Sequence, residues 1–249
     1  LLAFLFFMIL SQTRGAFLGL GAAVFAFLAY LVLSAKGGAR KAALAVLIVL
    51  VLTAALLFAN SHNEFLGKVP GGRLIQFDFS ADSFSTRFWT WGASWKVFLE
   101  RPLLGWGPEN FSAVFDKYFD PRHFVPGQNT ETWFDRAHSV FFDYLAEAGI
   151  LGLLSYLSIF AVFYFHISRK FGGGTAGRGG ASGAAPGAGR YRPADAGPSA
   201  VERALMFSLP VGYLVQGIVL FDVLPIYINL FIFLAFAFYS FYVRYETAS

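Results

Sequence analysis

The chain has no cysteine among its 249 residues, and its long apolar runs carry no charged side chain. The absence of cysteine excludes a disulfide framework and a metal site built from thiolates, although it does not identify a compartment. Charged residues make up 14% of the chain and hydrophobic residues 57%, which differs from an ordinary soluble domain. The composition therefore indicates an integral membrane protein.

Five apolar segments are each long enough to span a bilayer and contain no Asp, Glu, Lys or Arg. They are residues 16–34, 42–60, 150–168, 204–221 and 223–243. Residues 1–10 are equally apolar but shorter, and they lack the flanks of a signal peptide. We therefore expect an all-α, polytopic membrane protein. Its first region, residues 1–60, would begin with a truncated helix, in a chain that is the C-terminal part of a longer protein.

Lys and Arg in the loops predict the orientation. A basic cluster at residues 36–41 follows the first complete span without any acidic residue, which predicts a cytoplasmic loop. Alternation then places residues 169–203 and the tail 244–249 in the cytoplasm, and the loop 61–149 on the outer side. The net charge of +4 is a sum over two faces, so it gives no reason to expect nucleic-acid binding.

A glycine-rich, low-complexity run occupies residues 171–200. It has few large apolar side chains and cannot bury enough surface to offset its ordering entropy, which predicts a flexible linker. A phosphate cradle is the alternative, but no strand precedes the run and no GKS or GKT sequence closes it.

The outer loop contains patterns typical of amphipathic helices. One helix is expected from Ser83 or Ser85 to about Glu100. Trp91 and Trp95 lie on one face of this helix, which either rests on the membrane interface or packs into the core of the loop.

Two further helices are expected in the same loop. One would have Pro108 at its first position and Glu109 in its first turn. The other would begin at His138 and lead straight into the span at Ile150.

Several short motifs occur in order along the chain. They are SQTRGA at residues 11–16, Arg87 followed by Trp91, PLLGWGPENF at 102–111, AHS at 137–139 and EAGILG at 147–152. Together they resemble the C-terminal catalytic region of the O-antigen ligase and Wzy-type polymerase superfamily, over roughly residues 11–154. The resemblance implies an inverting transferase of the bacterial inner membrane that needs neither metal nor cofactor. It would move a glycan at the periplasmic face from an undecaprenyl-diphosphate donor to lipid A core, another glycan or protein.

The resemblance also implies roles for three residues. Arg14 and Arg87 match the arginines that bind the donor diphosphate, and His138 matches the general base. The chemistry fits these residue types, because the planar fork of Arg binds phosphate oxygens and keeps its charge. A His side chain has a pKa close enough to neutrality to accept the proton of an attacking hydroxyl.

Each of these residues also has a structural interpretation. Arg14 could anchor a helix end at the lipid headgroups, Arg87 could be a solvated helix residue, and His138 could be satisfied by its neighbours. The family match favours the functional interpretation.

Other ionisable residues have weaker assignments. Asp143 and Glu147 could orient the base or the acceptor, and Asp222 could border the site, although capping and surface roles are equally compatible with the pattern. His62, His123 and His166 lie outside the matched motifs and are interpreted as structural.

Two other functions stay open. A flippase or transporter of lipid-linked sugars would use the same arginines but would need cationic groups along its spans, which the five segments lack. A structural anchor that binds a periplasmic partner would not depend on His138. In every case membrane lipids surround the chain.

Overall fold

The computed structural model describes residues 13–60, 82–124, 132–172 and 199–240, together with Phe6 and Leu10. Every regular element in these residues is helical, which confirms the predicted all-α membrane fold. The elements are α2 (Arg14–Ser34), α3 (Gly37–Ala59), α5 (Asp82–Glu100), α6 (Phe111–Lys117), the 3-10 helix η2 (Pro121–His123), α7 (Val140–Gly172), α8 (Ala200–Gly217) and α9 (Leu224–Phe238).

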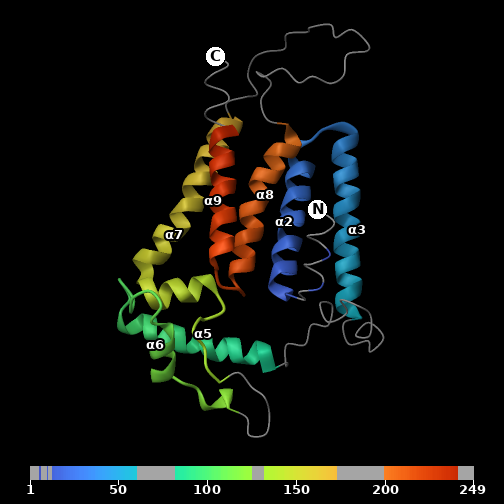
Figure 1. Cartoon of the computed structure of the whole chain (residues 1–249). Coiled ribbons are helices and arrows are strands. Elements are labelled where there is room, and N and C mark those ends of the chain that lie inside the picture. The colour runs from blue at the N-terminus through green and yellow to red at the C-terminus, as the bar shows by residue number, and fades with distance from the viewer. Residues whose placement is uncertain are drawn as a thin grey trace.

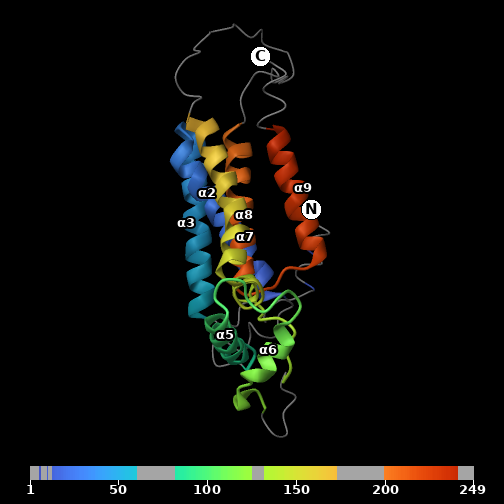
Figure 2. The same cartoon turned by 90° about the vertical axis from the view of Figure 1, so that its left-hand side faces the viewer.

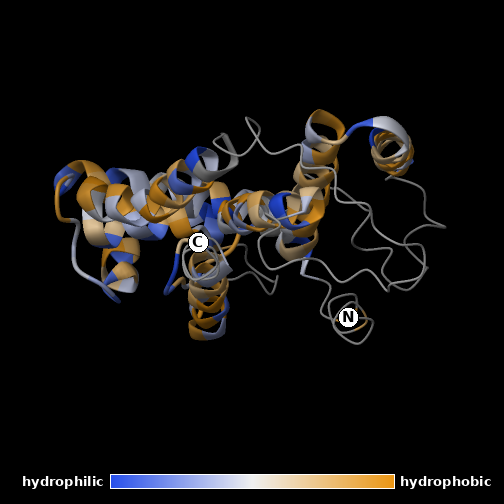
Figure 3. Ribbon diagram, turned by 90° about the horizontal axis from the view of Figure 1, so that it is seen from above, coloured by the Kyte–Doolittle hydropathy of each residue, from blue (hydrophilic) through white to orange (hydrophobic). Residues whose placement is uncertain are grey.

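Helices α2, α3, α7, α8 and α9 run roughly parallel as a bundle, and α5 and α6 lie together at one end of it (Figure 1, Figure 2). Among the described helices, α2, α3 and α7 are long and apolar enough to cross a membrane, and α9 is shorter. Much of the bundle ribbon has the colour of hydrophobic residues (Figure 3), and many of its large apolar side chains are exposed. Such surfaces suit lipid, because a helix satisfies its own backbone hydrogen bonds.

Helices α2 and α8 pack closely through small residues. A Cβ added at Gly19 would lie 2.8 Å from the carbonyl oxygen of Gly212, and one added at Gly212 would lie 2.7 Å from that of Gly19. Close backbone approach of this kind is typical of helix pairs in membranes. It aligns the start of α2 with the end of α8.

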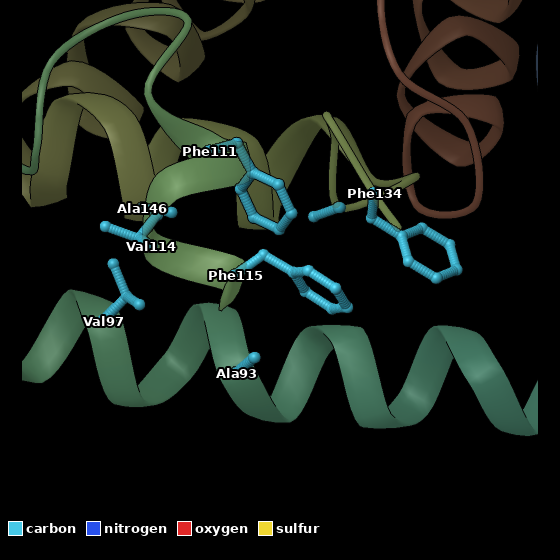
Figure 4. Close-up of a cluster of buried hydrophobic side chains, with 8 residues drawn as sticks. Ala93, Val97, Phe111, Val114, Phe115, Phe134 and Ala146 are labelled. Carbon is cyan, nitrogen blue, oxygen red and sulfur yellow. The ribbon is translucent and has the colours of Figure 1, made fainter. Parts of the chain in front are cut away.

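The α5–α6 region, meaning the described residues from 82 to 139, packs around its own hydrophobic core (Figure 4). Side chains from α5, α6, the segment before α7 and the first turns of α7 meet there. The buried members are Ala93, Val97, Phe111, Val114, Phe115, Phe134, Ala137 and Ala146. This core fixes α5 against the start of α7.

The predicted helix that stops near Glu100 is confirmed as α5, and its aromatic face contributes to the core of this region through Trp91. Trp91 is half-buried, stacks on Phe142 at 5.2 Å and donates from Nε1 to the carbonyl oxygen of Ala137 at 2.9 Å. Trp95 is 49% exposed. Trp91 therefore belongs to the core of this region, whereas Trp95 faces its surroundings.

Two predicted helix starts are wrong. Pro108 and Glu109 precede α6, which begins at Phe111, because Glu109 has a left-handed φ of 62°. His138 also has a left-handed φ, of 54°, and α7 begins after it at Val140. A left-handed residue cannot continue a right-handed helix, so each helix starts beyond it.

The predicted straight run from His138 into the membrane is also wrong, because α7 is broken at Gly149. Its φ of 65° and ψ of −166° are a conformation that glycine alone adopts readily. A Cβ at this position would lie 2.5 Å from the carbonyl carbon of Leu103. The break therefore requires glycine for its backbone conformation and for its close contact.

The turn formed by residues 101–107 docks against this break and supplies its missing hydrogen bonds. The N–H of Trp106 donates to the carbonyl oxygen of Ala146 at 3.0 Å. The N–H of Ile150 donates to the carbonyl oxygen of Pro102 at 2.8 Å. A broken helix inside a protein needs such partners, because unpaired buried backbone groups are costly.

Candidate functional site

His138 lies in the segment just before α7, at the bundle end where α5 and α6 lie. Its half-buried ring packs edge-on against Phe134 and Phe221, with centroids 5.5 and 5.3 Å away. Nδ1 lies 3.3 Å from the carbonyl oxygen of Arg136. A carbonyl oxygen can only accept, so this contact favours a proton on Nδ1 and leaves Nε2 able to take up another.

The α8–α9 turn, residues 218–223, contacts this segment through a backbone hydrogen bond and a ring contact. Helix α8 ends at Gly217, earlier than the predicted boundary at 221, and the turn follows. The N–H of Val140 donates to the carbonyl oxygen of Leu220 at 3.1 Å. With the ring contact between Phe221 and His138, this bond places the histidine directly beside the turn.

The two predicted arginines lie on segments that meet the same turn. Arg87, half-buried on α5, donates from Nη1 to the carbonyl oxygen of Val219 at 2.9 Å. Arg14 is exposed at the start of α2. Its neighbour Gly15 packs so tightly that an added Cβ would lie 2.7 Å from Cγ of Leu220.

Spacing in the sequence could not establish whether these three residues come together. The structure brings the segments of Arg14, Arg87 and His138 onto the α8–α9 turn, at one end of the bundle. The side chain of Arg87 and the ring of His138 contact this turn, and Arg14 lies one residue from the glycine that packs against it. Their chemical roles stay predictions.

The remaining predicted residues line a cavity of ≈ 620 Å³ next to this turn. Its wall comes from four segments, at residues 108–109, 135–136, 140–148 and 221–227. Asp143, Glu147 and Asp222 line it, whereas Arg14, Arg87 and His138 do not. The predicted residues thus form two neighbouring groups, one around the turn and one around the cavity.

Asp143 and Asp222 hold parts of the wall in place. Oδ1 of Asp143 accepts the N–H of Ala137, one residue before His138, at 2.6 Å. Oδ2 of Asp222 accepts the hydroxyl of Tyr213 at 2.7 Å. The Asp143 carboxylate therefore positions the backbone that carries the histidine.

Arg136 is a site residue that the sequence did not single out. Nη2 of its guanidinium lies 2.5 Å from Oε1 of Glu109, and Nη1 lies 3.8 Å from Oε2 of Glu147. Burial works to lower the pKa of Arg136, but these two carboxylates raise it above its ordinary value. Tyr144 and Tyr227 also line the cavity and were also missed, because nothing in their local sequence signals chemistry.

The other histidines lie away from this cavity or outside the described residues. His123 is fully buried, its ring lies 5.2 Å from that of Phe134, and neither of its nitrogens has a hydrogen-bond partner among the described residues. His166 lines a separate apolar cavity between α7 and α9. His62 and most of the glycine-rich run fall outside the described residues. Within the described ranges, no three His, Asp or Glu side chains gather as a metal site would require.

A family model described as O-antigen ligase matches residues 1–157. The chain belongs to the O-antigen ligase family. It is therefore a membrane glycosyltransferase of the O-antigen ligase type, as the motifs predicted. Neither the curated proteins nor the solved structures include a match to it. The matched residues contain Arg14, Arg87 and His138, whereas Asp222 lies beyond them.

Proposed function

We propose that this protein transfers a glycan from an undecaprenyl-diphosphate carrier to an acceptor hydroxyl at the periplasmic face of the bacterial inner membrane. The acceptor is lipid A core for a ligase, a second lipid-linked glycan for a polymerase, or protein. The observation that carries the proposal is the meeting of the Arg14, Arg87 and His138 segments at the α8–α9 turn.

His138 is the general base of this proposal. As the acceptor oxygen attacks the anomeric carbon, its proton moves to Nε2, since Nδ1 faces the carbonyl oxygen of Arg136. A new carbon–oxygen bond forms, and the bond from the anomeric carbon to the diphosphate breaks. Its electron pair leaves with the diphosphate, and attack from the opposite face inverts the anomeric centre. A base of this kind typically contributes about 10²–10⁴-fold in rate.

Arg14 and Arg87 neutralise the leaving diphosphate. Negative charge on this group increases as the glycosidic bond breaks, so a fixed cation stabilises the transition state more than the ground state. Arginine suits the role because it stays protonated and binds phosphate oxygens in pairs. With the leaving group stabilised in this way, the proposal requires no metal or cofactor.

The charge distribution supports a periplasmic site. Lys36 in the α2–α3 connection and Arg40 and Lys41 at the start of α3 lie at the bundle end opposite α5 (Figure 1). By the positive-inside rule that end belongs in the cytoplasm. The end with His138 then faces the periplasm, where no nucleotide sugar is expected and the donor must come with a lipid carrier.

The test uses purified full-length protein in lipid nanodiscs, supplied with undecaprenyl-diphosphate-linked glycan and lipid A core, or with the donor alone. Glycosylated core identifies a ligase, and longer lipid-linked chains from the donor alone identify a polymerase. We expect His138→Ala to lower the rate by about two to four orders of magnitude.

The matched control is His166→Ala, which removes a histidine of α7 that does not line the site cavity. It should retain wild-type transfer. Equal product from His138→Ala and the wild type would exclude His138 as the base. Movement of the carrier across the bilayer without any transferred glycan would instead favour the flippase.

A further inference from the structure

The cavity beside the α8–α9 turn has the size and the position of a second substrate site. Its volume is ≈ 620 Å³, and small-molecule sites typically enclose about 300–1,000 Å³. Phe221 lines it and also packs against the ring of His138 at 5.3 Å. Phe221 therefore links the cavity to the proposed base, which does not itself line the cavity.

The charges on the wall disfavour a phosphate. The described lining residues include five with carboxylates and one with a guanidinium, that of Arg136. This guanidinium is already 2.5 Å from Oε1 of Glu109 and 3.8 Å from Oε2 of Glu147.

Burial raises the pKa of Asp143 to about 7 and also raises the pKa of Glu147 and Asp222, so these three side chains carry less than their full charge at neutral pH. With Glu109 and Asp135 also on the wall, a phosphate would still meet more negative than positive charge, and electrostatic repulsion would oppose its binding. A neutral or cationic group would not meet this barrier.

Glu147 provides an independent indication of a ligand. The residue is 9% exposed, and its Oε1 has no hydrogen-bond partner among the described residues. A buried carboxylate oxygen without a hydrogen-bond donor costs free energy, and a hydroxyl group of a ligand would supply a strong hydrogen bond to it. Tyr144 and Tyr227 line the same cavity and add aromatic side chains to its wall. Such a wall suits a sugar.

We infer that this cavity binds the acceptor glycan, that the bound sugar is unphosphorylated and rich in hydroxyl or amino groups, and that Glu147 accepts a hydrogen bond from it. The inference rests on the proposed function, because it takes His138 as the base. It places the acceptor on the acidic side of the α8–α9 turn and the donor diphosphate on the side of Arg14 and Arg87.

The experiment measures initial rates of transfer by the full-length protein while donor and acceptor are varied separately. The acceptors are lipid A cores that end in an unphosphorylated hexose or in the same hexose carrying a phosphate. Glu147→Gln keeps the size of the side chain and removes its charge. We expect the KM for the unphosphorylated acceptor to rise roughly tenfold or more, with the KM for the donor unchanged.

Glu100→Gln is the matched control. Glu100 lies on α5, outside the cavity, and pairs with Lys117 at 2.6 Å, so both KM values should match the wild type. Tyr227→Phe removes one hydroxyl from the wall and should raise the acceptor KM by a smaller factor. It carries the test if size-exclusion chromatography shows that Glu147→Gln does not fold.

The possible failures can be told apart. A wild-type protein that transfers glycan to no acceptor contradicts the proposed function itself. Active wild type with an unchanged acceptor KM in Glu147→Gln and Tyr227→Phe overturns only the acceptor site. A phosphorylated acceptor that reacts as well as the unphosphorylated one would overturn it too.

Discussion

The two sides of the α8–α9 turn differ in charge. On one side, Arg87 donates to the carbonyl oxygen of Val219, and the helix that begins at Arg14 packs against Leu220. On the other side, Asp222 and Glu147 belong to a cavity wall that carries five carboxylates and one guanidinium. A single short turn thus separates a cationic surface from an acidic cavity.

This difference suggests how one site can distinguish two glycan substrates. Donor and acceptor both contain sugars, so recognition of sugar alone would not determine which substrate binds at which position. In the proposed reaction, a donor diphosphate would be attracted to the cationic side and repelled by the acidic side, which would orient the donor. His138 contacts Phe221, the residue of the turn that also lines the cavity, so the proposed base would lie where the two sides meet.

Removal of a cation from the Arg14 and Arg87 side should have the largest effect on transfer. Arg87→Ala should lower kcat by about 10²–10³-fold, the usual cost of losing a group that stabilises transition-state charge. Arg87→Lys keeps the charge but loses the planar fork, so its rate should lie between those of Arg87→Ala and the wild type. Initial rates at saturating acceptor measure the effect.

Arg169→Ala is the control for this series, because Arg169 lies near the far end of α7 and stacks on Phe165. It should transfer glycan at the wild-type rate. If Arg87→Ala, correctly folded, also kept that rate, the cationic side would have no part in diphosphate departure.

A second change acts on the acidic side through the backbone. Gly149→Ala forces a side chain into a left-handed position and against Leu103, so it should destabilise the fold by on the order of 1–3 kcal/mol or more. The acceptor KM should rise with it, because Glu147 lies two residues from the break. Thermal unfolding in detergent and transfer kinetics measure both effects.

Gly92→Ala serves as the matched substitution. Gly92 lies inside α5, and a Cβ there would meet no atom within 4 Å, so alanine should be neutral or slightly stabilising. Similar unfolding temperatures for both variants would mean that the break in α7 tolerates a side chain.

Local sequence patterns predicted the helices of the bundle well. An apolar run such as 16–34 specifies its helix by length and composition, and α2 covers it. The boundaries failed where one backbone conformation decides them. Glu109 and His138 adopt a left-handed φ. This conformation is uncommon for residues other than glycine, so tertiary contacts must stabilise it.

The division of the site into two sides could not be predicted from the sequence. The motifs indicated Arg14, Arg87 and His138 as candidates, but their relation depends on the α8–α9 turn, which lies far from them in the chain. Arg136 lies one residue before the AHS motif and had no predicted role, because its partner Glu109 comes from another segment. Pairwise contacts between distant segments leave no periodic signal in one sequence.

The smallest predicted effect concerns the dependence of stability on pH, through His123, which packs against the hydrophobic core of the α5–α6 region. Burial lowers the pKa of His123, opposed by the charge of Asp120 and aided by that of Arg122. Folded protein therefore binds a proton at this residue less readily than unfolded protein, whose His pKa is about 6.5. Stability should fall as the pH decreases below about 6.5, because the unfolded state then takes up more protons.

Thermal unfolding between pH 8 and pH 5 measures this dependence, with His123→Phe as the comparison. Phenylalanine fills the space among the surrounding rings and cannot titrate, so its unfolding temperature should fall less over this range than that of the wild type. The difference isolates His123, since the carboxylates are common to both proteins. Parallel curves would mean that His123 is protonated as easily in the folded core as in the unfolded chain. A charged His123 ring would then lie against Phe134, which also contacts His138.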